Sequence, residues 1–118
     1  MNWTMGSNDV EVTSEQVNGS LILKPLGDID LSRSPSLRLQ LDQAQGSGPT
    51  KLIIDLAEVP YMDSSGVATL VEAMKAARAA GRKLVLCGMQ ERVKSIFEIA
   101  RLDMVFTIVE TREEALQA

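Results

Sequence analysis

Apolar residues along the chain follow two spacings, one typical of β-strands and one typical of α-helices. Five short β-prone runs are present, at residues 10–12, 21–23, 52–56, 84–87 and 105–109. Between the later runs, apolar residues recur every three or four positions, as on one face of a helix. These stripes are Leu37, Leu41 and Ala44, then Val67, Leu70, Val71, Met74 and Ala77, then Val93, Ile96, Phe97 and Ala100. A short terminal helix that includes Leu116 is expected after Thr111 and Glu114, which have capping-box spacing.

The predicted element order is therefore β-β-α-β-α-β-α-β-α. The runs at residues 52–56 and 84–87 are almost entirely apolar, which is typical of strands covered on both faces. Asn18-Gly19 separates the first two runs and favours a tight hairpin turn. Later strands alternate with helices, so they should pair in parallel through right-handed crossovers. We predict an α/β fold with a mixed, mostly parallel sheet of about five strands and four helices.

One helix boundary is marked clearly in the sequence. We expect Ser34 to be the N-cap of the first helix, because Pro35 follows at a position that needs no backbone N–H donor.

Size and charge narrow the possible functions. The chain has 118 residues, of which 45% are hydrophobic, and this is enough for one domain with a buried core. Its 12 Lys and Arg against 16 Asp and Glu give a net charge of -4, which disfavours direct binding to nucleic acid or to an anionic membrane. No apolar run approaches the roughly 20 residues that span a bilayer, and no signal peptide is recognisable, so we expect a cytoplasmic protein without membrane insertion.

Residue counts also exclude several kinds of site. Histidine is absent and Cys87 is the only cysteine. Disulfide frameworks, Cys/His zinc sites and His-based catalytic triads are therefore excluded, and we expect no metal, no cofactor and no catalytic residues. Because Cys87 ends an apolar run, we expect it to be a small buried hydrophobic residue.

The most informative segment joins the strand at residues 52–56 to the second helix. Residues 59–66 read Val-Pro-Tyr-Met-Asp-Ser-Ser-Gly, which places a carboxylate and two hydroxyls at a helix N-terminus. This loop leaves the carboxyl end of a parallel strand, where ligands usually gather. The simplest interpretation is helix capping by Asp63 or Ser64, which stabilises a helix by about 0.5 to 2 kcal/mol.

A regulatory interpretation competes with capping. Capping needs one side chain, so a second serine before Gly66 leaves a hydroxyl free for phosphorylation. A phosphate here would gain from the helix dipole and from nearby backbone N–H groups, so the fold should survive. The surface would change, since about two negative charges would be added beside Asp63 and near Asp28 and Asp30.

A third interpretation makes Ser64 or Ser65 a catalytic nucleophile, which requires a positioned base. A Ser–Lys pair is the remaining option without histidine. The candidate lysines are Lys51, Lys75 and Lys83. They lie at element ends or on an exposed helical face, where we expect them to be solvated.

Asp55 suggests comparison with the phospho-acceptor of receiver domains, because it stands near the end of a central apolar strand. The comparison fails elsewhere, since two strands open this chain and residues 107–111 contain no lysine. We expect Asp55 to fix a loop or to cap a helix.

Taken together, four segments resemble the STAS domains, a family named for sulphate transporters and anti-sigma-factor antagonists. The segments are residues 27–30, 52–56, 62–66 and 84–88, which read Gly-Asp-Ile-Asp, Leu-Ile-Ile-Asp-Leu, Met-Asp-Ser-Ser-Gly and Leu-Val-Leu-Cys-Gly. The resemblance places a STAS domain at residues 9–118. Residues 1–8, which include Trp3, form a separate N-terminal segment that is either a disordered tail or packs on the sheet.

The resemblance implies a bacterial anti-sigma-factor antagonist that is not an enzyme. In that branch the second serine of the Asp-Ser-Ser-Gly motif is phosphorylated, which corresponds to Ser65. The unphosphorylated protein would bind an anti-sigma factor that is also a serine kinase, and so release the sigma factor. Phosphorylation by that kinase would end binding, and a PP2C-like phosphatase would reverse it.

The resemblance also implies a partner-binding surface, in which Met62 is expected as an exposed apolar contact. Its expected residues are Asp28, Asp30, Met62, Asp63, Ser64, Ser65 and Gly66. Gly66 would either allow close approach of the kinase or serve local packing. The alternative function is a non-catalytic STAS subunit of a signalling scaffold or of a lipid-transport ABC system.

Overall fold

The structure is a computed structural model that describes residues 8–118. Its elements are β1 (Glu11–Val17), β2 (Ser20–Leu26), α1 (Ser34–Gly46), β3 (Lys51–Asp55), α2 (Ser64–Ala79), β4 (Lys83–Cys87), α3 (Glu91–Ile99), the 3-10 helix η1 (Leu102–Met104), β5 (Thr107–Val109) and α4 (Arg112–Gln117). This order confirms the prediction, with one short 3-10 helix added. Residues 1–7, most of the N-terminal segment, lie outside the described residues.

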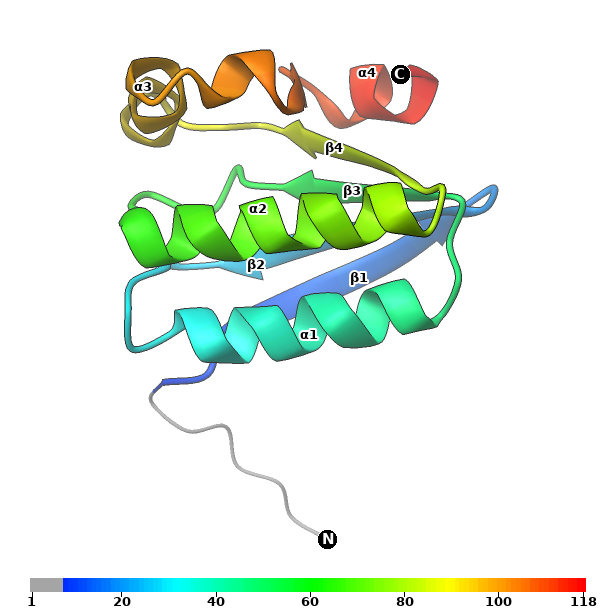
Figure 1. Cartoon of the computed structure of the whole chain (residues 1–118), viewed down its shortest axis with the longest axis horizontal. Helices are drawn as coiled ribbons and strands as arrows, with labels where there is room; N and C mark the ends of the chain where they lie inside the picture. The colour runs from blue at the N-terminus through cyan, green and yellow to red at the C-terminus, as the bar shows by residue number, and fades with distance from the viewer. Residues whose placement is uncertain (1–7) are drawn as a thin grey trace, which may run out of the picture.

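The strands form one mixed sheet in the order β1-β2-β3-β4-β5 (Figure 1). β1 and β2 pair antiparallel, and the remaining neighbours pair in parallel. Asn18 and Gly19 both have positive φ, 49° and 84°, as a tight hairpin turn with the twist of the strands requires. The predicted α/β fold with a mostly parallel sheet is therefore confirmed.

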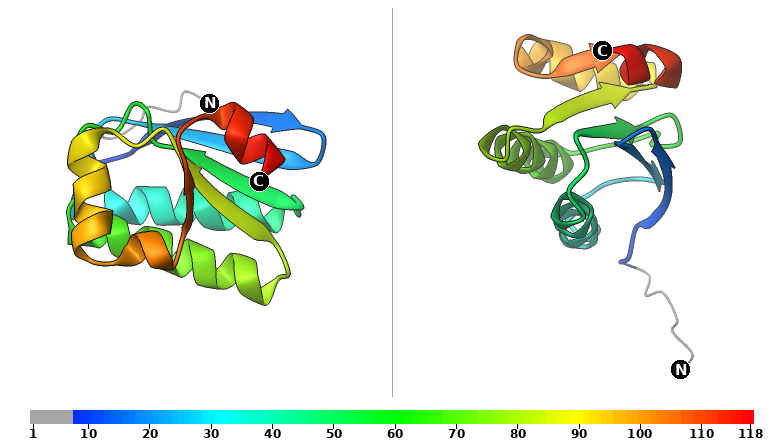
Figure 2. Two further views of the ribbon diagram at one scale, coloured as in Figure 1. Left: turned by 90° about the horizontal axis from the view of Figure 1, so that it is seen from above. Right: turned by 90° about the vertical axis from the view of Figure 1, so that its right-hand side faces the viewer.

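Helices cover both faces of the sheet. α1 and α2 lie side by side on one face, whereas α4 lies on the other (Figure 2). Alternate residues of β3 pack on opposite faces of the sheet. Leu52 and Ile54 belong to the larger core, and Ile53 belongs to the smaller core under α4. Cys87 is fully buried in the smaller core, as expected, and burial raises the pKa of its thiol to about 11.

Lys51 was expected to be solvated, and this expectation was wrong. Its Nζ donates hydrogen bonds to the carbonyl oxygens of Ala115, Leu116 and Ala118, at 2.9, 2.9 and 2.7 Å. It therefore caps the C-terminus of α4, where a cation also complements the helix dipole, and is not simply solvated. Partial burial lowers the pKa of its amine.

Several element boundaries differ from the prediction. β1 and β2 have seven residues each instead of the three expected, and β1 begins at Glu11 and not at Val10. Ser34 is the first residue of α1 and not its N-cap, because the chain already turns at Asp30, whose backbone oxygen accepts from the Ser34 N–H at 2.8 Å. The last strand is shorter than residues 105–109. Phe106 N–H donates to the carbonyl of Leu102 at 2.9 Å. The Phe106 ring packs edge-on against the Phe97 ring, with 5.5 Å between the ring centres. Strand pairing therefore begins only at Thr107.

No helix within residues 8–118 has the length and apolar character needed to cross a bilayer.

Candidate functional site

Two loops meet where α1 and α2 begin, and they are joined as if they were short parallel strands. Ile29 N–H donates to the Tyr61 carbonyl at 3.0 Å, and Asp63 N–H donates to the Ile29 carbonyl at 3.1 Å. Ile29 and Met62 form an isolated parallel bridge. The loop after β2 is thus held against the loop after β3, which brings Asp30 to the segment that contains the two serines.

Asp63 is the N-cap of α2. Its Oδ1 accepts from the backbone N–H groups of Ser65 and Gly66, at 2.9 and 3.4 Å, and its Oδ2 accepts from Leu31 N–H at 3.1 Å. One carboxylate therefore caps the helix and ties down the neighbouring loop. Of the two expected capping candidates the structure selects Asp63, and Ser64 is left exposed as the first residue of the helix.

Ser65 is partly buried and its hydroxyl points inward. Its Oγ donates to Asp63 Oδ1 at 2.5 Å and lies 2.6 Å from the Oγ of Ser34. The Ser34 Oγ in turn donates to the backbone oxygen of Asp30 at 2.6 Å. Ser34 is a member of this site that sequence reasoning missed, because 31 residues separate it from Ser65 and no local pattern pairs them.

Asp28 and Asp30 occupy different positions in the β2–α1 loop. Asp30 Oδ1 accepts from the backbone N–H groups of Ser32 and Arg33 and from the Ser32 hydroxyl, at 3.1, 3.1 and 2.8 Å. Asp30 therefore shapes the turn that enters α1. Asp28 is exposed, so its carboxylate is available at the surface.

Met62 is fully buried, and its expected exposure was wrong. The segment from Tyr61 to Asp63 is extended, so successive side chains point to opposite sides. Met62 points into the larger core beside Ile29, while the preceding Tyr61 is turned outward with 39% of its surface exposed. Periodicity alone could not assign these two directions, because the loop has no regular pattern.

Gly66 is buried and tightly enclosed. A Cβ at this position would lie 2.6 Å from Met62 Cγ, 2.9 Å from Ile29 Cγ2 and 3.1 Å from the Ile29 backbone oxygen. Of the two roles that the sequence left open for Gly66, the structure supports local packing.

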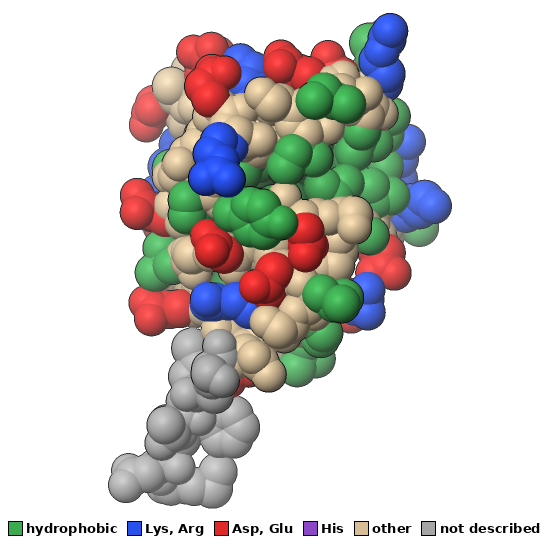
Figure 3. Space-filling view, turned by 90° about the vertical axis from the view of Figure 1, so that its left-hand side faces the viewer, with side chains coloured by type: hydrophobic (Ala, Val, Ile, Leu, Met, Phe, Trp, Pro, Cys, Tyr) green, Lys and Arg blue, Asp and Glu red, His purple; other side chains and the backbone are tan. Residues whose placement is uncertain are grey.

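Exposed apolar residues beside Ser65 were also missed by sequence reasoning. Leu31 has 74% of its surface exposed although its backbone is bonded to Asp63, and Tyr61 lies on the adjoining loop. The Arg92 guanidinium lies 6.0 Å from the centre of the Tyr61 ring. Figure 3 looks onto this end of the molecule, where apolar side chains are bordered by acidic and basic ones. We call Leu31, Tyr61, Asp28 and Ser64, which lie with Ser65 on the two joined loops and at the start of α2, the serine face.

A known domain family matches most of the chain. The sequence profile of the STAS domain matches residues 11–115. The chain belongs to the STAS domain family. This STAS protein is 38% identical over 82 residues to the anti-sigma-B factor antagonist of Listeria monocytogenes, a match that spans 70% of this chain and 72% of the relative.

Solved structures share the fold of this STAS protein. An anti-sigma factor antagonist from Mycobacterium paratuberculosis superposes with a TM-score of 0.86 at 19% identity, over 97% of both chains. The Bacillus cell fate determinant SpoIIAA in its phosphorylated form superposes with a TM-score of 0.69 at 22% identity, over 91% of this chain and 97% of that one.

Asp55 of this STAS protein fixes a loop, as expected. It is only 5% exposed, its Oδ1 accepts from Ala57 N–H at 3.0 Å, and its Oδ2 accepts from the Arg112 guanidinium at 2.9 Å. A Cβ on Gly88 would come within 2.8 Å of Asp55 Oδ1, so the carboxylate is closely covered. The ion pair also fastens α4 to β3, a contact that nothing in the local sequence indicates.

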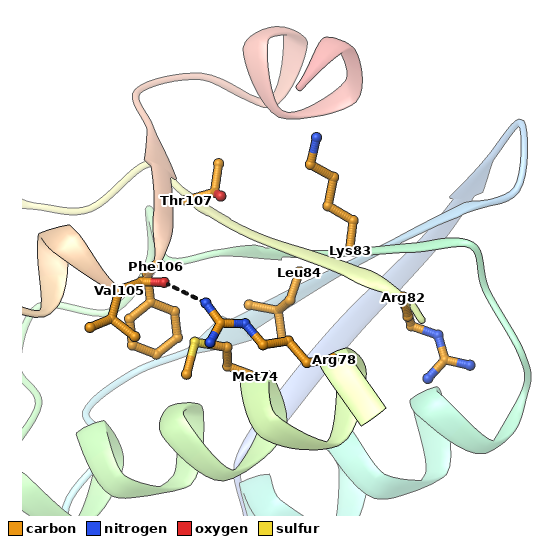
Figure 4. A pocket seen from close by; sticks show the side chains of 8 residues that line it. All are labelled: Met74, Arg78, Arg82, Lys83, Leu84, Val105, Phe106 and Thr107. Carbon is orange, nitrogen blue, oxygen red and sulfur yellow. Dashed lines mark hydrogen bonds between the residues drawn. The ribbon is translucent and has the colours of Figure 1, made fainter. Parts of the chain in front are cut away.

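A hollow of about 200 Å³ lies elsewhere on the STAS protein, between α2 and β5 (Figure 4). Met74, Leu84 and Phe106 form its apolar lining, and Arg78 donates to the Val105 carbonyl at 3.3 Å across its edge. Met74 is about three helical turns from the start of α2, so the hollow is separate from Ser65. Residues 8–118 contain no group of three or more acidic or cysteine side chains that could hold a metal ion.

The charge of Asp63 should make the stability of the STAS protein depend on pH. The hydrogen bond from the Ser65 hydroxyl, with further bonds from backbone N–H groups, lowers the pKa of Asp63 below its ordinary 3.8, against the opposing effect of burial. A carboxyl group whose pKa is lower in the folded chain stabilises the fold above its unfolded pKa of about 4. That contribution is lost as the pH falls through the still lower folded value.

We therefore expect Asp63→Asn to lower the free energy of unfolding by roughly 1 kcal/mol near neutral pH, because neutral hydrogen bonds replace charge-assisted ones. The difference from wild type should shrink as the pH falls below about 5. Urea titrations at a series of pH values measure it. Asp42→Asn, on the exposed side of α1, controls for loss of one negative charge. A difference that stays constant across the acid range would contradict the assignment.

Proposed function

We propose that this STAS protein is an anti-sigma factor antagonist and that phosphorylation of Ser65 switches it off. The unphosphorylated serine face binds an anti-sigma factor that is also a serine kinase, and this binding releases the sigma factor. A PP2C-like phosphatase restores the active form. The observation that carries the proposal is a partly buried serine hydroxyl at the start of α2, next to two joined loops that carry exposed apolar and acidic side chains. The name of the Listeria relative supports the same function.

A phosphate on Ser65 would have to lie on the outer surface. Asp63 Oδ1 already accepts from the Ser65 and Gly66 N–H groups, so these donors are not free for a phosphate as the sequence suggested. The same carboxylate oxygen is 2.5 Å from Ser65 Oγ, so a phosphate bonded to that Oγ would bring its anionic oxygens close to the carboxylate, and the two groups would repel strongly. The phosphoserine should therefore turn away from Asp63 and project from the serine face.

This reorientation of the phosphoserine side chain would change partner binding. Leu31 and Tyr61 offer apolar contact area close to Ser65, and exposed aromatic residues are common anchors of protein interfaces. A dianion placed between them must be desolvated or paired when a partner docks, and it adds repulsion to a face that already carries Asp28. Met62 and Gly66, which were expected in the interface, support the face from below, while Asp30 shapes its loop.

In this proposal the chain is the substrate of the phosphorylation reaction. The bond between Ser65 Oγ and the γ-phosphorus of ATP forms, the bond from that phosphorus to the bridging oxygen breaks, and ADP leaves with the electron pair. The kinase supplies magnesium-bound ATP and the base that takes the hydroxyl proton.

Affinity capture from host lysate tests the function directly, with wild-type and Ser65→Asp proteins as bait and mass spectrometry of what each retains. Wild type should retain a serine kinase of the anti-sigma type, and Ser65→Asp should not. If both baits retain the same scaffold or transporter subunits, the protein is instead a STAS subunit of such an assembly and Ser65 is not its switch.

A further inference from the structure

Ser34 contacts the proposed phosphorylation site from the neighbouring helix. Its side chain is only 4% exposed, and its Oγ lies 2.6 Å from Ser65 Oγ. We propose that Ser34 is a positioning residue that holds the Ser65 hydroxyl in an inward, resting rotamer and thereby slows its phosphorylation. The inference deepens the proposed function and rests on it for the kinetic consequence, whereas the rotamer itself can be measured without a kinase.

The site has fewer hydroxyl protons than short oxygen–oxygen contacts. Three short oxygen–oxygen contacts form a chain from Asp63 Oδ1 through the two hydroxyls to the Asp30 carbonyl, at 2.5, 2.6 and 2.6 Å. Ser34 and Ser65 each supply one proton. The carboxylate is the strongest acceptor, so the Ser65 proton points to Asp63. The Ser34 proton is then shared between the Asp30 carbonyl and Ser65 Oγ.

This arrangement opposes phosphoryl transfer in two ways. Donation from Ser34 occupies a lone pair of Ser65 Oγ, the atom that must attack the γ-phosphorus. The Ser65 proton also faces Asp63, on the protein side, and a kinase docked on the serine face can place its base only on the outer side. Ser65 must therefore rotate about χ1 before it reacts, and it loses its contact with Ser34 when it does so.

Ser34→Ala removes this contact without leaving a buried polar group unpaired. The Asp30 carbonyl keeps the N–H groups of Ser34 and Arg33 as donors, at 2.8 and 3.1 Å. Ser65 keeps its bond to Asp63. Alanine also suits the first turn of a helix, so α1 should form normally. Ser32→Ala is the matched control, because it removes a hydroxyl from the same loop that donates to Asp30 Oδ1 and has no bond to Ser65.

The first measurement is the pair of Hα–Hβ couplings of Ser65 by NMR, which report its χ1 populations. Wild type and Ser32→Ala should show one dominant rotamer, and Ser34→Ala should show a lower population of that rotamer, because only the bond to Asp63 then holds the hydroxyl. The second is steady-state phosphorylation with the kinase recovered by capture. One hydrogen bond contributes about 1 kcal/mol, so kcat should rise about threefold to tenfold in Ser34→Ala with KM unchanged.

Unchanged couplings in Ser34→Ala would overturn the inference, as would a kcat no higher than that of Ser32→Ala. A structural disturbance would instead alter KM or the amide spectrum of the whole serine face. Failure of any anti-sigma-type kinase to phosphorylate wild-type Ser65 would remove the proposed function and the kinetic role together, and the couplings would still show whether Ser34 holds the hydroxyl.

Discussion

A Ser65→Asp protein is expected to keep its fold and to bind its anti-sigma partner about 100-fold more weakly than wild type. The added carboxylate cannot point toward Asp63, whose Oδ1 occupies that side. It must therefore lie on the serine face, where a docked partner would have to desolvate it. Like charges that are brought together in an interface cost several kcal/mol, which is consistent with a loss of this size.

The fold should tolerate the charge because the opposing effects are small. Position 65 is the second residue of α2, where a negative charge gains about 0.3 to 1 kcal/mol from the helix dipole. Loss of the hydroxyl bond to Asp63 costs about 1 kcal/mol, and repulsion between the two carboxylates adds to this cost. We expect a net loss in the free energy of unfolding of no more than about 2 kcal/mol.

Isothermal titration calorimetry with the purified partner and thermal melts separate the two effects. Ser65→Ala is the control, since it loses the same hydroxyl without gaining charge and should still bind. An unfolded Ser65→Asp protein would contradict the claim that this helix start accepts negative charge. Equal loss of binding in both variants would show that the hydroxyl itself, and not the added charge, matters for docking.

Gly66→Val should destabilise the protein by about 3 kcal/mol or more. The first atom of any side chain at this position meets Met62 and the Ile29 backbone oxygen within 3.1 Å. Met62 and Ile29 are themselves fully buried, so neither has free space to move into. Relief would require separating the two loops, and this would break their mutual hydrogen bonds.

Urea denaturation measures this loss, and Ala68→Val is the matched control on the same helix. Ala68 is exposed, so valine there should cost only its lower helix propensity, about 0.5 kcal/mol. A Gly66→Val protein as stable as the control would show that the loops can shift apart. Phosphorylation of Ser65 in such a protein would then make Gly66 dispensable for the kinase as well.

Local sequence patterns were sufficient for the order of the elements. The apolar run at residues 52–56 predicted a strand covered on both faces, and Leu52, Ile53 and Ile54 indeed divide between two cores. The stripes of α1 and α2 were also recognisable, because a helix repeats its buried face every three or four residues over several turns. The Asp-Ser-Ser-Gly motif predicted a cap at the start of α2, and Asp63 indeed caps it, because capping residues act within a few positions of one another.

Errors occurred where a residue's environment comes from a distant part of the chain. Ser34 carries the usual identity of an N-cap, but Asp30 and Ser65 already engage its hydroxyl. Lys51 was expected in water because its partners are the carbonyls of a helix more than 60 residues away. Phe106 was assigned to a strand because its apolar character does not distinguish a strand from the bend after η1, where its ring packs on Phe97.

By itself, therefore, the sequence determined the strand and helix order and the family, and it predicted Ser65 as the residue that is modified. Each of these depends on spacings of a few residues, because the backbone geometry of helices, strands and caps brings residues at such spacings together. Only the tertiary structure decided that Met62 is buried while Leu31 and Tyr61 are exposed, and that Ser34 touches Ser65. Those facts arise from the contact between the β2–α1 and β3–α2 loops, and side-chain direction in a loop is set by its packing partner.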